Sequence, residues 1–312
     1  MGKRLFFDPR LSGDATISCA TCHQPERAWT DGQALSQGYP GTLYFRNVPT
    51  LLGASHNRYF YWDGRLSGDD LPTLIRDHIS EAHFMQADGR LVIERMRQIP
   101  AYQSDFREVF GGEPTYGRIL NAVAAFVRTL ESSATPVDRY LAGDRGALSS
   151  ASRRGLELFR GQAGCIACHH GPRLTDERFH SIGVRPNKAI FDQPLRHISF
   201  RRFFRTLGLA EYAQLRHDAG HRAVTKERGD DRLFRTPSLR EVGRTAPYMH
   251  NGTLATLDEV VAFYNRGGSP LQGPLHLASK DQADLVAFLQ ALSSKPVPIK
   301  RPEPASYGLR KP

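Results

Sequence analysis

The chain has 312 residues, enough for two domains of ordinary size, and its hydrophobic fraction of 40% can support a packed core in each. It contains no run of eighteen apolar residues, so no transmembrane segment is expected. The formal net charge of +10 could attract an acidic partner, but no nucleic-acid-binding motif is present, so nucleic acid is not an expected partner.

The predicted helices occur in the same order in the two parts of the chain. A short helix over residues 2–6 precedes a C-x-x-C-H motif, and residues 155–159 precede a second such motif. An amphipathic helix follows each motif after about a hundred residues, at residues 119–130 and 284–292. Both helices carry apolar residues at spacings of three and four, which indicates one buried face each.

The two C-x-x-C-H motifs contain every cysteine of the chain. In this pattern two thiols attach covalently to a haem, and the adjacent histidine supplies an axial nitrogen to its iron. A zinc site, a disulfide or a thioredoxin-type redox pair would also use two close cysteines. Zinc sites and redox pairs, however, need no histidine directly after the second cysteine. The motifs therefore predict two covalently bound haem c groups. The residues that would hold them are Cys19, Cys22, His23, Cys165, Cys168 and His169.

A stretch rich in Ser, Pro and Gly, from residue 132 to residue 146, separates the two repeats. A helix, a haem motif and a second helix in this order are typical of a cytochrome c domain. We therefore expect a mainly α fold of two tandem cytochrome c-like domains with one covalent haem c each, at residues 1–140 and 141–295. The proline-rich residues 296–312 are expected to form an extended tail.

Each predicted domain contains a long insertion between its haem motif and its last helix, at residues 39–89 and 185–252. Long loops in compact domains usually carry function, and a simple electron carrier would not need them. Much of the positive charge lies in the second insertion, since residues 185–244 hold 14 Lys and Arg but 7 Asp and Glu. Several of these arginines could pair with haem propionates while the rest are solvated, and this interpretation is favoured for most of them. A basic surface could also attract an acidic partner protein.

Five segments resemble those of bacterial dihaem cytochrome c peroxidases, a family that includes the MauG-type enzymes. They are residues 5–13, 46–52, 61–65, 234–240 and 245–252, and the resemblance runs in order over nearly the whole chain. In this family the N-terminal haem reacts with peroxide and the C-terminal haem transfers electrons, and MauG-type enzymes oxidise residues of a partner protein. The resemblance implies that the haem held by His23 is the reactive one.

The resemblance also implies an axial ligand for the second haem, opposite His169. Other peroxidases of the family have Met fourteen positions after the histidine that matches His250, whereas MauG-type enzymes have Tyr, and here that position is Tyr264. Because a tyrosine oxygen favours oxidised iron and a thioether favours reduced iron, Tyr264 should lower the potential of this haem. Met249 is the rival ligand. Tyr264 could instead be a core residue whose hydroxyl bonds to the backbone.

Two further sites follow from the resemblance. Trp62 corresponds to the tryptophan between the two haems, where an indole can relay electrons, although it could also be a core aromatic residue. Asn47, Thr245 and Pro247 match the family's calcium site at the domain interface. A side-chain oxygen and two backbone carbonyls are donors that Ca²⁺ prefers, and the alternative for Asn47 is a turn.

The sequence departs from the family pattern at two places. The family's acid–base glutamate precedes a methionine, but here Phe84 precedes Met85, and Glu81 and His83 are the nearby candidates for moving the peroxide proton. Both could also be surface residues of a helix. Some peroxidases have a histidine that caps the N-terminal haem in the resting state. The region of Tyr39 lacks it, so no such cap is expected.

Together these features predict a dihaem oxidoreductase that uses hydrogen peroxide to oxidise a small electron-donor protein or residues of a partner protein. Tyr264 favours the MauG-type alternative. A dihaem electron-transfer cytochrome without turnover is the other class considered, and O₂ could replace peroxide. Haem c is normally attached outside the bacterial cytoplasm, so a periplasmic location is expected, although no signal peptide precedes Leu5 in these residues.

Overall fold

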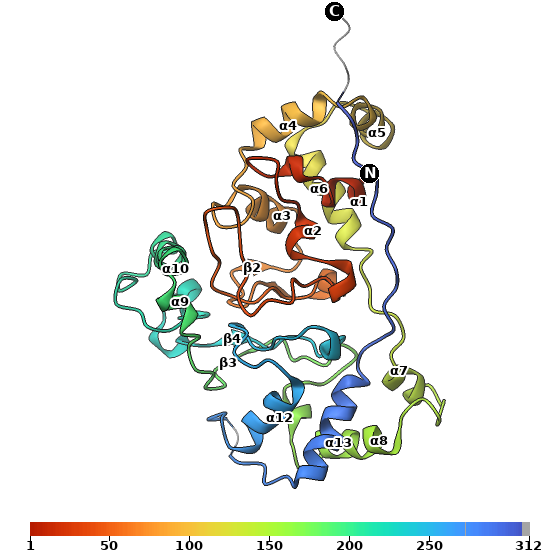
Figure 1. Cartoon of the computed structure of the whole chain (residues 1–312), viewed down its shortest axis with the longest axis vertical. Helices are drawn as coiled ribbons and strands as arrows, with labels where there is room; N and C mark the ends of the chain where they lie inside the picture. Colours follow the sequence, from red (N-terminus) through yellow and green to blue (C-terminus); the bar gives the residue numbers. More distant parts are fainter. Residues whose placement is uncertain (272, 308–312) are drawn as a thin grey trace, which may run out of the picture.

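The computed structural model describes residues 1–271 and 273–307. The described chain is mostly helical and has two halves, one above the other in Figure 1. Each half has its own core of buried apolar side chains, so the expected mainly α fold is confirmed. None of the helices in the described ranges combines the length and the apolar character that a membrane span needs.

The first half contains a core that extends from Leu5 to Leu130. Its helices are α1 (Gly2–Phe6), α2 (Cys19–Cys22), α3 (Leu71–Ser80), α4 (Gly89–Arg97), α5 (Pro100–Phe110) and α6 (Tyr116–Val127). The predicted helices at residues 2–6 and 119–130 correspond to α1 and α6, which pack against each other. At this contact Phe6 of α1 packs against Phe126 of α6, with ring centres 5.3 Å apart.

The second half repeats this packing. Its helices are α7 (Pro136–Leu141), α8 (Ser150–Arg160), α9 (Ala189–Asp192), α10 (Pro194–Thr206), α11 (Arg222–Thr225), α12 (Leu257–Asn265) and α13 (Ser279–Gln290). Helices α8 and α13 correspond to the predicted elements at residues 155–159 and 284–292, and they pack against each other. Phe159 contacts Phe288 with ring centres 5.0 Å apart.

A glycine permits the close helix crossing in both halves. A Cβ atom on Gly2 would lie 1.9 Å from the carbonyl oxygen of Ala122, and one on Gly155 would lie 2.0 Å from that of Asp284. Any larger residue would separate the helices, because helix backbones approach this closely only where the side chain is missing. The repeat in the sequence is therefore a repeat of one packing arrangement.

Two short antiparallel strand pairs lie where the halves meet. Strand β1 (Tyr59–Phe60) pairs with β2 (Leu66–Ser67), and β3 (Phe179–His180) pairs with β4 (Phe234–Arg235). A third cluster of buried residues joins α9 and α10 to Leu35, Tyr44 and Phe45 of the first half. This part of the second insertion projects to the side of the molecule in Figure 1.

A buried charge cluster also joins the halves. The Arg46 guanidinium, in a residue that is 1% exposed, lies 2.6 Å from Asp63 and 2.6 Å from Asp218. Arg65 lies 3.1 Å from the same Asp63 carboxylate. Because Asp218 belongs to the second insertion, this cluster holds that insertion against the first half.

The C-terminal segment runs back along the first half (Figure 1). Its described residues, 296–307, form neither helix nor strand, and Ile299 and Ala305 pack against the first core. The remainder of the predicted tail, residues 308–312, lies outside the described residues. The domain boundary at residue 140 stays a prediction, and Val137 of α7 packs into the second core.

Candidate functional site

The first haem motif forms the short helix α2. Ser18 precedes the helix, and its backbone amide donates to the Thr21 hydroxyl at 3.0 Å. The amide of His23 then donates to the carbonyl of Cys19 at 2.9 Å, so the histidine follows the helix directly. Its Nδ1 donates to the carbonyl of Trp29 at 3.0 Å. The proton is therefore on Nδ1, and Nε2 keeps the lone pair that a metal needs.

The second motif has the same local geometry on a 3₁₀ turn, Cys165–Ala167. The amide of His169 donates to the carbonyl of Cys165 at 2.9 Å, and its Nδ1 donates to the carbonyl of Leu174 at 3.0 Å. Both histidines are thus anchored through Nδ1 to a backbone carbonyl. This anchoring is what orients a histidine ligand and leaves its other nitrogen available to iron.

The thiols are compatible with attachment to haem. None of the four cysteines forms a disulfide. Burial raises the pKa of Cys19 to about 12 and that of Cys22 and Cys165 to about 11. Among the described residues, one group of His, Cys and acidic side chains lies close enough together to hold a metal ion: Cys168, Asp176 and His180. This group does not contain the other cysteines and histidines of the two motifs. The C-x-x-C-H segments therefore fit covalent haem better than zinc or a disulfide.

Tyr264 lies in α12 on the side of the second haem motif. The helix begins after Thr256, whose hydroxyl accepts from the amide of Glu259 at 3.1 Å. Tyr264 packs against the second core together with Cys165. Burial raises the pKa of Tyr264.

The hydroxyl of Tyr264 makes no hydrogen bond to the described residues, whereas that of Tyr248 in the same core donates to the Val242 carbonyl at 3.0 Å. Tyr264 is partly buried and packs on the same cluster as Cys165, which is compatible with the ligand interpretation. The rival Met249 is not among the described residues that pack on this core.

Trp62 is bonded to both halves of the molecule. Its indole N–H donates to the carbonyl of Asn47 at 2.9 Å. Its own carbonyl accepts from the amide of Arg235, in β4 of the second half, at 2.9 Å. The next residue, Asp63, accepts at its carbonyl from Nδ1 of His221 at 2.7 Å. Trp62 therefore lies at the junction between the part that carries His23 and the part that carries His169.

The three predicted calcium ligands come from both sides of this junction. Asn47 is buried, and its amide donates to the carbonyl of His250 at 2.8 Å. In the described part of the chain, the Asn47 side-chain oxygen and the carbonyls of Thr245 and Pro247 accept no hydrogen bond. These oxygens are hard donors of the kind that Ca²⁺ prefers, and the calcium site stays a prediction.

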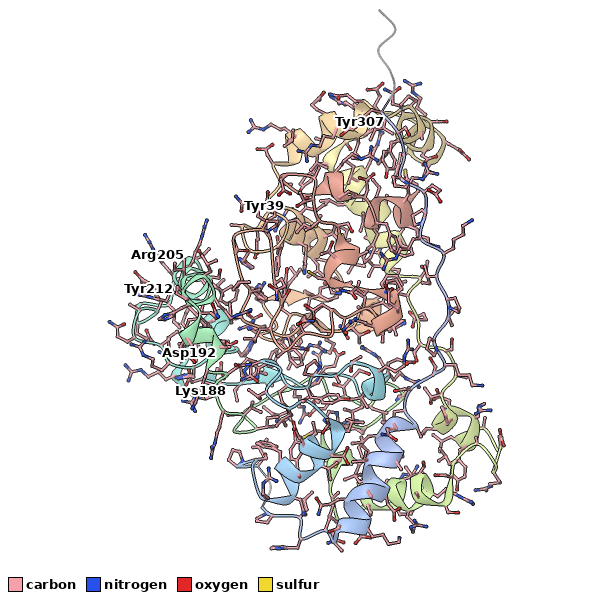
Figure 2. All side chains as sticks on the ribbon, viewed as in Figure 1. Tyr39, Lys188, Asp192, Arg205, Tyr212 and Tyr307 are labelled. Carbon is pink, nitrogen blue, oxygen red and sulfur yellow. The ribbon has the colours of Figure 1, made fainter. Side chains whose placement is uncertain are left out.

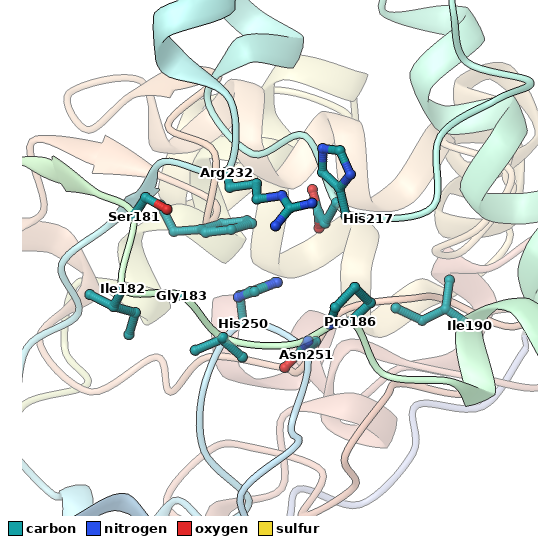
Figure 3. Close-up of a pocket in the computed structure, with 12 residues that line it drawn as sticks. Ser181, Ile182, Gly183, Pro186, Ile190, His217, Arg232, His250 and Asn251 are labelled. Carbon is teal, nitrogen blue, oxygen red and sulfur yellow. The ribbon is translucent and has the colours of Figure 1, made fainter. Parts of the chain in front are cut away.

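His250 belongs to the second insertion and stacks on Phe234, with ring centres 3.7 Å apart. Burial lowers its pKa to about 4. Figure 3 shows that His217, His250 and Asn251 line the same cavity. His250 thus lines a cavity of the second insertion and also accepts, at its carbonyl, a hydrogen bond from Asn47 of the first half.

The two acid–base candidates follow helix α3. Glu81 Oε2 and His83 Nε2 lie 2.9 Å apart, although the angle is not that of a hydrogen bond. Burial alone would raise the pKa of Glu81, but His83 and then Arg65 hold it below its usual value. Glu81 is thus an ionised carboxylate, able to accept a proton.

Ring contacts connect this loop to the first haem motif. His83 contacts Phe84 with ring centres 4.3 Å apart, Phe84 stacks on His78 at 4.4 Å, and His78 lies 6.4 Å from His23. His78 was not identified from the sequence. Its spacing of four and three residues from Leu74 and Ile75 places it on the inner face of α3, and this spacing is the signal that could have identified it.

Comparisons with known proteins point to one family. Residues 1–146 match the family model described as di-haem cytochrome c peroxidase. The chain is 45% identical over 314 residues to the cytochrome-c peroxidase IdrP2 of Denitromonas iodatirespirans, with 99% of this chain and 85% of that protein covered. It is 36% identical over 311 residues to the methylamine utilization protein MauG of Methylorubrum extorquens, with 97% and 80% covered.

A solved structure leads to the same family. The crystal structure of a MauG-like protein associated with microbial copper homeostasis matches with a TM-score of 0.79 and 29% identity, over 94% of this chain and 88% of that one. The expected fold and the expected resemblance are thereby confirmed. The chain therefore belongs to the di-haem cytochrome c peroxidase and MauG family and is an oxidoreductase with two haem c groups.

Proposed function

We propose that this protein uses hydrogen peroxide to oxidise residues of a partner protein or a small electron-donor protein, in the bacterial periplasm. The observation that carries the proposal is the position of Trp62, hydrogen-bonded to Asn47 on one side and to the amide of Arg235 on the other. An aromatic side chain at the junction of two haem-binding halves can carry electrons between two redox centres. An enzyme that reacts with peroxide at one haem and exchanges electrons with its partner at the other requires such a connection.

The residues around the first motif supply binding and proton transfer. When bound, the haem held by His23 supplies the redox chemistry that cleaves the peroxide O–O bond. Glu81 is our first candidate for the proton acceptor, because it is a carboxylate, as the family resemblance implies, and its lowered pKa keeps it ionised. His83, 2.9 Å from Glu81, would stabilise the carboxylate or take over its role.

The second motif would hold the haem that exchanges electrons with the partner, with His169 and Tyr264 as its axial ligands. The packing of Tyr264 on the same cluster as Cys165 supports this assignment. Because a tyrosine oxygen favours oxidised iron, Tyr264 favours oxidation of partner residues, as in MauG-type enzymes, over storage of an electron.

Calcium would bind at Asn47, Thr245 and Pro247 and hold the two halves in a fixed relation. Their three oxygens come from both sides of the Trp62 junction, and waters could complete the coordination shell. A bound ion there would keep Trp62 in place for electron transfer.

The partner protein is expected to be acidic. Helix α10 presents Arg201, Arg202 and Arg205 to solvent, and Leu195 and Ile198 on the same helix are 48% and 61% exposed. Lys188 and Arg205 lie on the outer edge of this projecting part of the molecule (Figure 2). Such a basic surface raises the association rate of a negatively charged protein.

Peroxide turnover tests the proposal. The holoprotein, prepared both fully oxidised and half-reduced, is mixed with peroxide and a reduced small c-type cytochrome, and peroxide consumption is followed. Consumption with donor oxidation supports the enzyme. Electron exchange with the donor in both preparations, without consumption of peroxide, would instead identify an electron-transfer cytochrome. Turnover with O₂ but not with peroxide would show that O₂ is the oxidant.

A further inference from the structure

Two histidine rings lie close together in the first half of the molecule. The ring centres of His23 and His78 lie 6.4 Å apart, and the ring planes are tilted by 54°. His23 belongs to the first haem motif, whereas His78 comes from the last turn of α3, in the first insertion. We propose that His78 is the second axial ligand of the first haem iron in the resting oxidised protein. The proposal shares with the proposed function the haem attached at residues 19–23, but it does not depend on reaction with peroxide.

The separation of the two rings is the one that coordination by both requires. Metal–imidazole bonds are about 2.0–2.1 Å long. The ring centre lies about 1.2 Å beyond the bonded nitrogen, as bond lengths of about 1.3–1.4 Å in a five-membered ring dictate. Two imidazoles on opposite sides of one metal ion therefore have centres about 6.4 Å apart. The observed distance between His23 and His78 is 6.4 Å.

A role for His78 as a proton acceptor for bound peroxide would need more space. In that case an oxygen atom would lie between the metal and the imidazole, at a hydrogen-bond distance of about 2.6–3.2 Å from the nitrogen. The ring centres would then be about 3 Å farther apart than in direct coordination. The measured separation leaves no room for such an atom, so the geometry points to a ligand rather than to an acid–base residue.

Both imidazoles are held in the tautomer that binds metals. Nδ1 of His78 donates to the carbonyl of Leu74 in its own helix at 2.8 Å, as Nδ1 of His23 donates to Trp29 at 3.0 Å. A carbonyl can only accept, so each Nδ1 carries the proton and each Nε2 keeps its lone pair. Across the described ranges, Nε2 of His78 has no hydrogen-bond partner. Histidine ligands are commonly anchored in this way.

The surrounding structure fixes the His78 ring in place. The Phe84 ring lies parallel to it at 4.4 Å, and the Tyr61 ring lies parallel to it at 5.5 Å. The loop after α3 folds back on the helix end, since the amide of Met85 donates to the carbonyl of His78 at 3.0 Å. While His78 is bound to the iron, peroxide could not bind there, and His78 would have to leave the iron first. The last turn of α3 and residues 81–87 form the segment that would have to move.

This ligand comes from a different element than the one considered from the sequence. The expectation of an uncapped first haem concerned the region of Tyr39, whose carbonyl closes a turn with Thr42. Figure 2 shows Tyr39 at the outer edge of the first half. His78 lies instead on α3, which packs against α6 in the first core.

Electron paramagnetic resonance of the oxidised holoprotein tests the proposal. The variant His78→Ala should convert one haem from low-spin to high-spin, and added imidazole should restore the low-spin signal by filling the position of the missing ring. His83→Ala, on the loop that follows the same helix, is the matched control and should leave the spin states unchanged.

A spectrum that His78→Ala leaves unchanged overturns the proposal, as does a shift to high spin that His83→Ala produces equally. If His78→Ala does not mature, near-infrared magnetic circular dichroism of the unmodified protein decides the matter: a bis-imidazole band supports the proposal, and its absence refutes it. These readouts record ligands and not turnover. A failure here can therefore be distinguished from a failure to consume peroxide.

Discussion

The indole N–H of Trp62 donates a hydrogen bond to the backbone carbonyl of Asn47 at 2.9 Å. Two residues that the sequence assigned to separate roles, electron relay and calcium binding, thus belong to one junction. The Asn47 amide continues the connection by donating to the carbonyl of His250, in the second half, at 2.8 Å. A change at the proposed calcium ligands would therefore alter the position of the indole.

Substitution of Trp62 tests the relay. Trp62→Phe keeps an aromatic ring but removes both the hydrogen bond to Asn47 and the more readily oxidised indole. Donor or partner oxidation should fall by at least about tenfold, while the absorption spectra of the two oxidised haems stay as they are. Stopped-flow measurement of donor oxidation provides the readout.

The control for this experiment is Tyr59→Phe, which alters an aromatic residue on strand β1 close to the same junction. Oxidation at the native rate in Trp62→Phe, or an equal loss in Tyr59→Phe, would show that the indole is not the relay.

The ligand role of Tyr264 is tested by Tyr264→Met. If the phenol oxygen binds iron, the substitution must change the ferric spectrum of one haem and raise its reduction potential, because a thioether favours reduced iron. Tyr248→Phe is the matched control, since Tyr248 packs on the same core and donates to Val242 at 3.0 Å. An unchanged ferric spectrum in Tyr264→Met would remove the main basis for placing this protein with the MauG-type enzymes.

Calcium removal should loosen the junction. Chelation of the holoprotein is expected to lower its Tm and to slow electron transfer between the haems, and added Ca²⁺ should reverse both effects. Asn47→Ala should abolish the response because it removes one of the three oxygen donors. Asn187→Ala removes a comparable contact, the bond from the Asn187 side chain to the Asn251 carbonyl at 3.0 Å, and should leave the response intact. A Tm that chelation does not shift in the native protein would contradict the assignment.

The sequence predicted the parts of this protein that depend on short patterns. The two C-x-x-C-H motifs form local turns that place His23 and His169 against nearby backbone carbonyls, and such turns need no distant contacts. The paired helices of each half were predictable because their apolar faces repeat with the helical period. The contact of His78 with His23 could not be derived in this way, because it depends on how α3 packs against the first core.

The same limit applies to the second insertion. Its composition predicted a basic surface, but not that Phe200, Phe203 and Phe204 of α10 would form a separate core with Phe45 of the first half. Contacts across such distances in the sequence are set by the packing of whole elements. No local pattern in either partner specifies the other.

The buried pair of Arg46 and Asp218 should dominate stability at the junction. The Asp218 carboxylate accepts two hydrogen bonds from the guanidinium, at 2.6 and 2.8 Å, and the two side chains are 1% and 2% exposed. Breaking a buried pair by changing one partner costs about 3–5 kcal/mol. Because Arg46 keeps its contact with Asp63, we expect about 3 kcal/mol for Asp218→Asn, which lowers the Tm by roughly 6–12 °C.

The pH dependence of this loss has a defined sign. Burial alone would raise the pKa of Asp218, but the charge and hydrogen bonds of Arg46 bring it below its ordinary value. A carboxyl whose pKa is lowered on folding stabilises the protein above its unfolded pKa of about 3.9, and this contribution is lost as the pH falls through the folded value. The Tm difference between the native protein and Asp218→Asn should thus be largest near pH 7 and narrow below about pH 4.

Asp138→Asn is the matched control for Asp218→Asn, because Asp138 also receives two hydrogen bonds from one arginine, Arg240, both at 2.9 Å. This pair is about one-third exposed, with side-chain exposures of 31% and 29%, and exposed pairs contribute about 0–1 kcal/mol. Differential scanning calorimetry of the three holoproteins between pH 3 and pH 8 gives the comparison. Equal losses in the two variants, or a gap that widens in acid, would contradict a stabilising role for the buried Arg46–Asp218 pair.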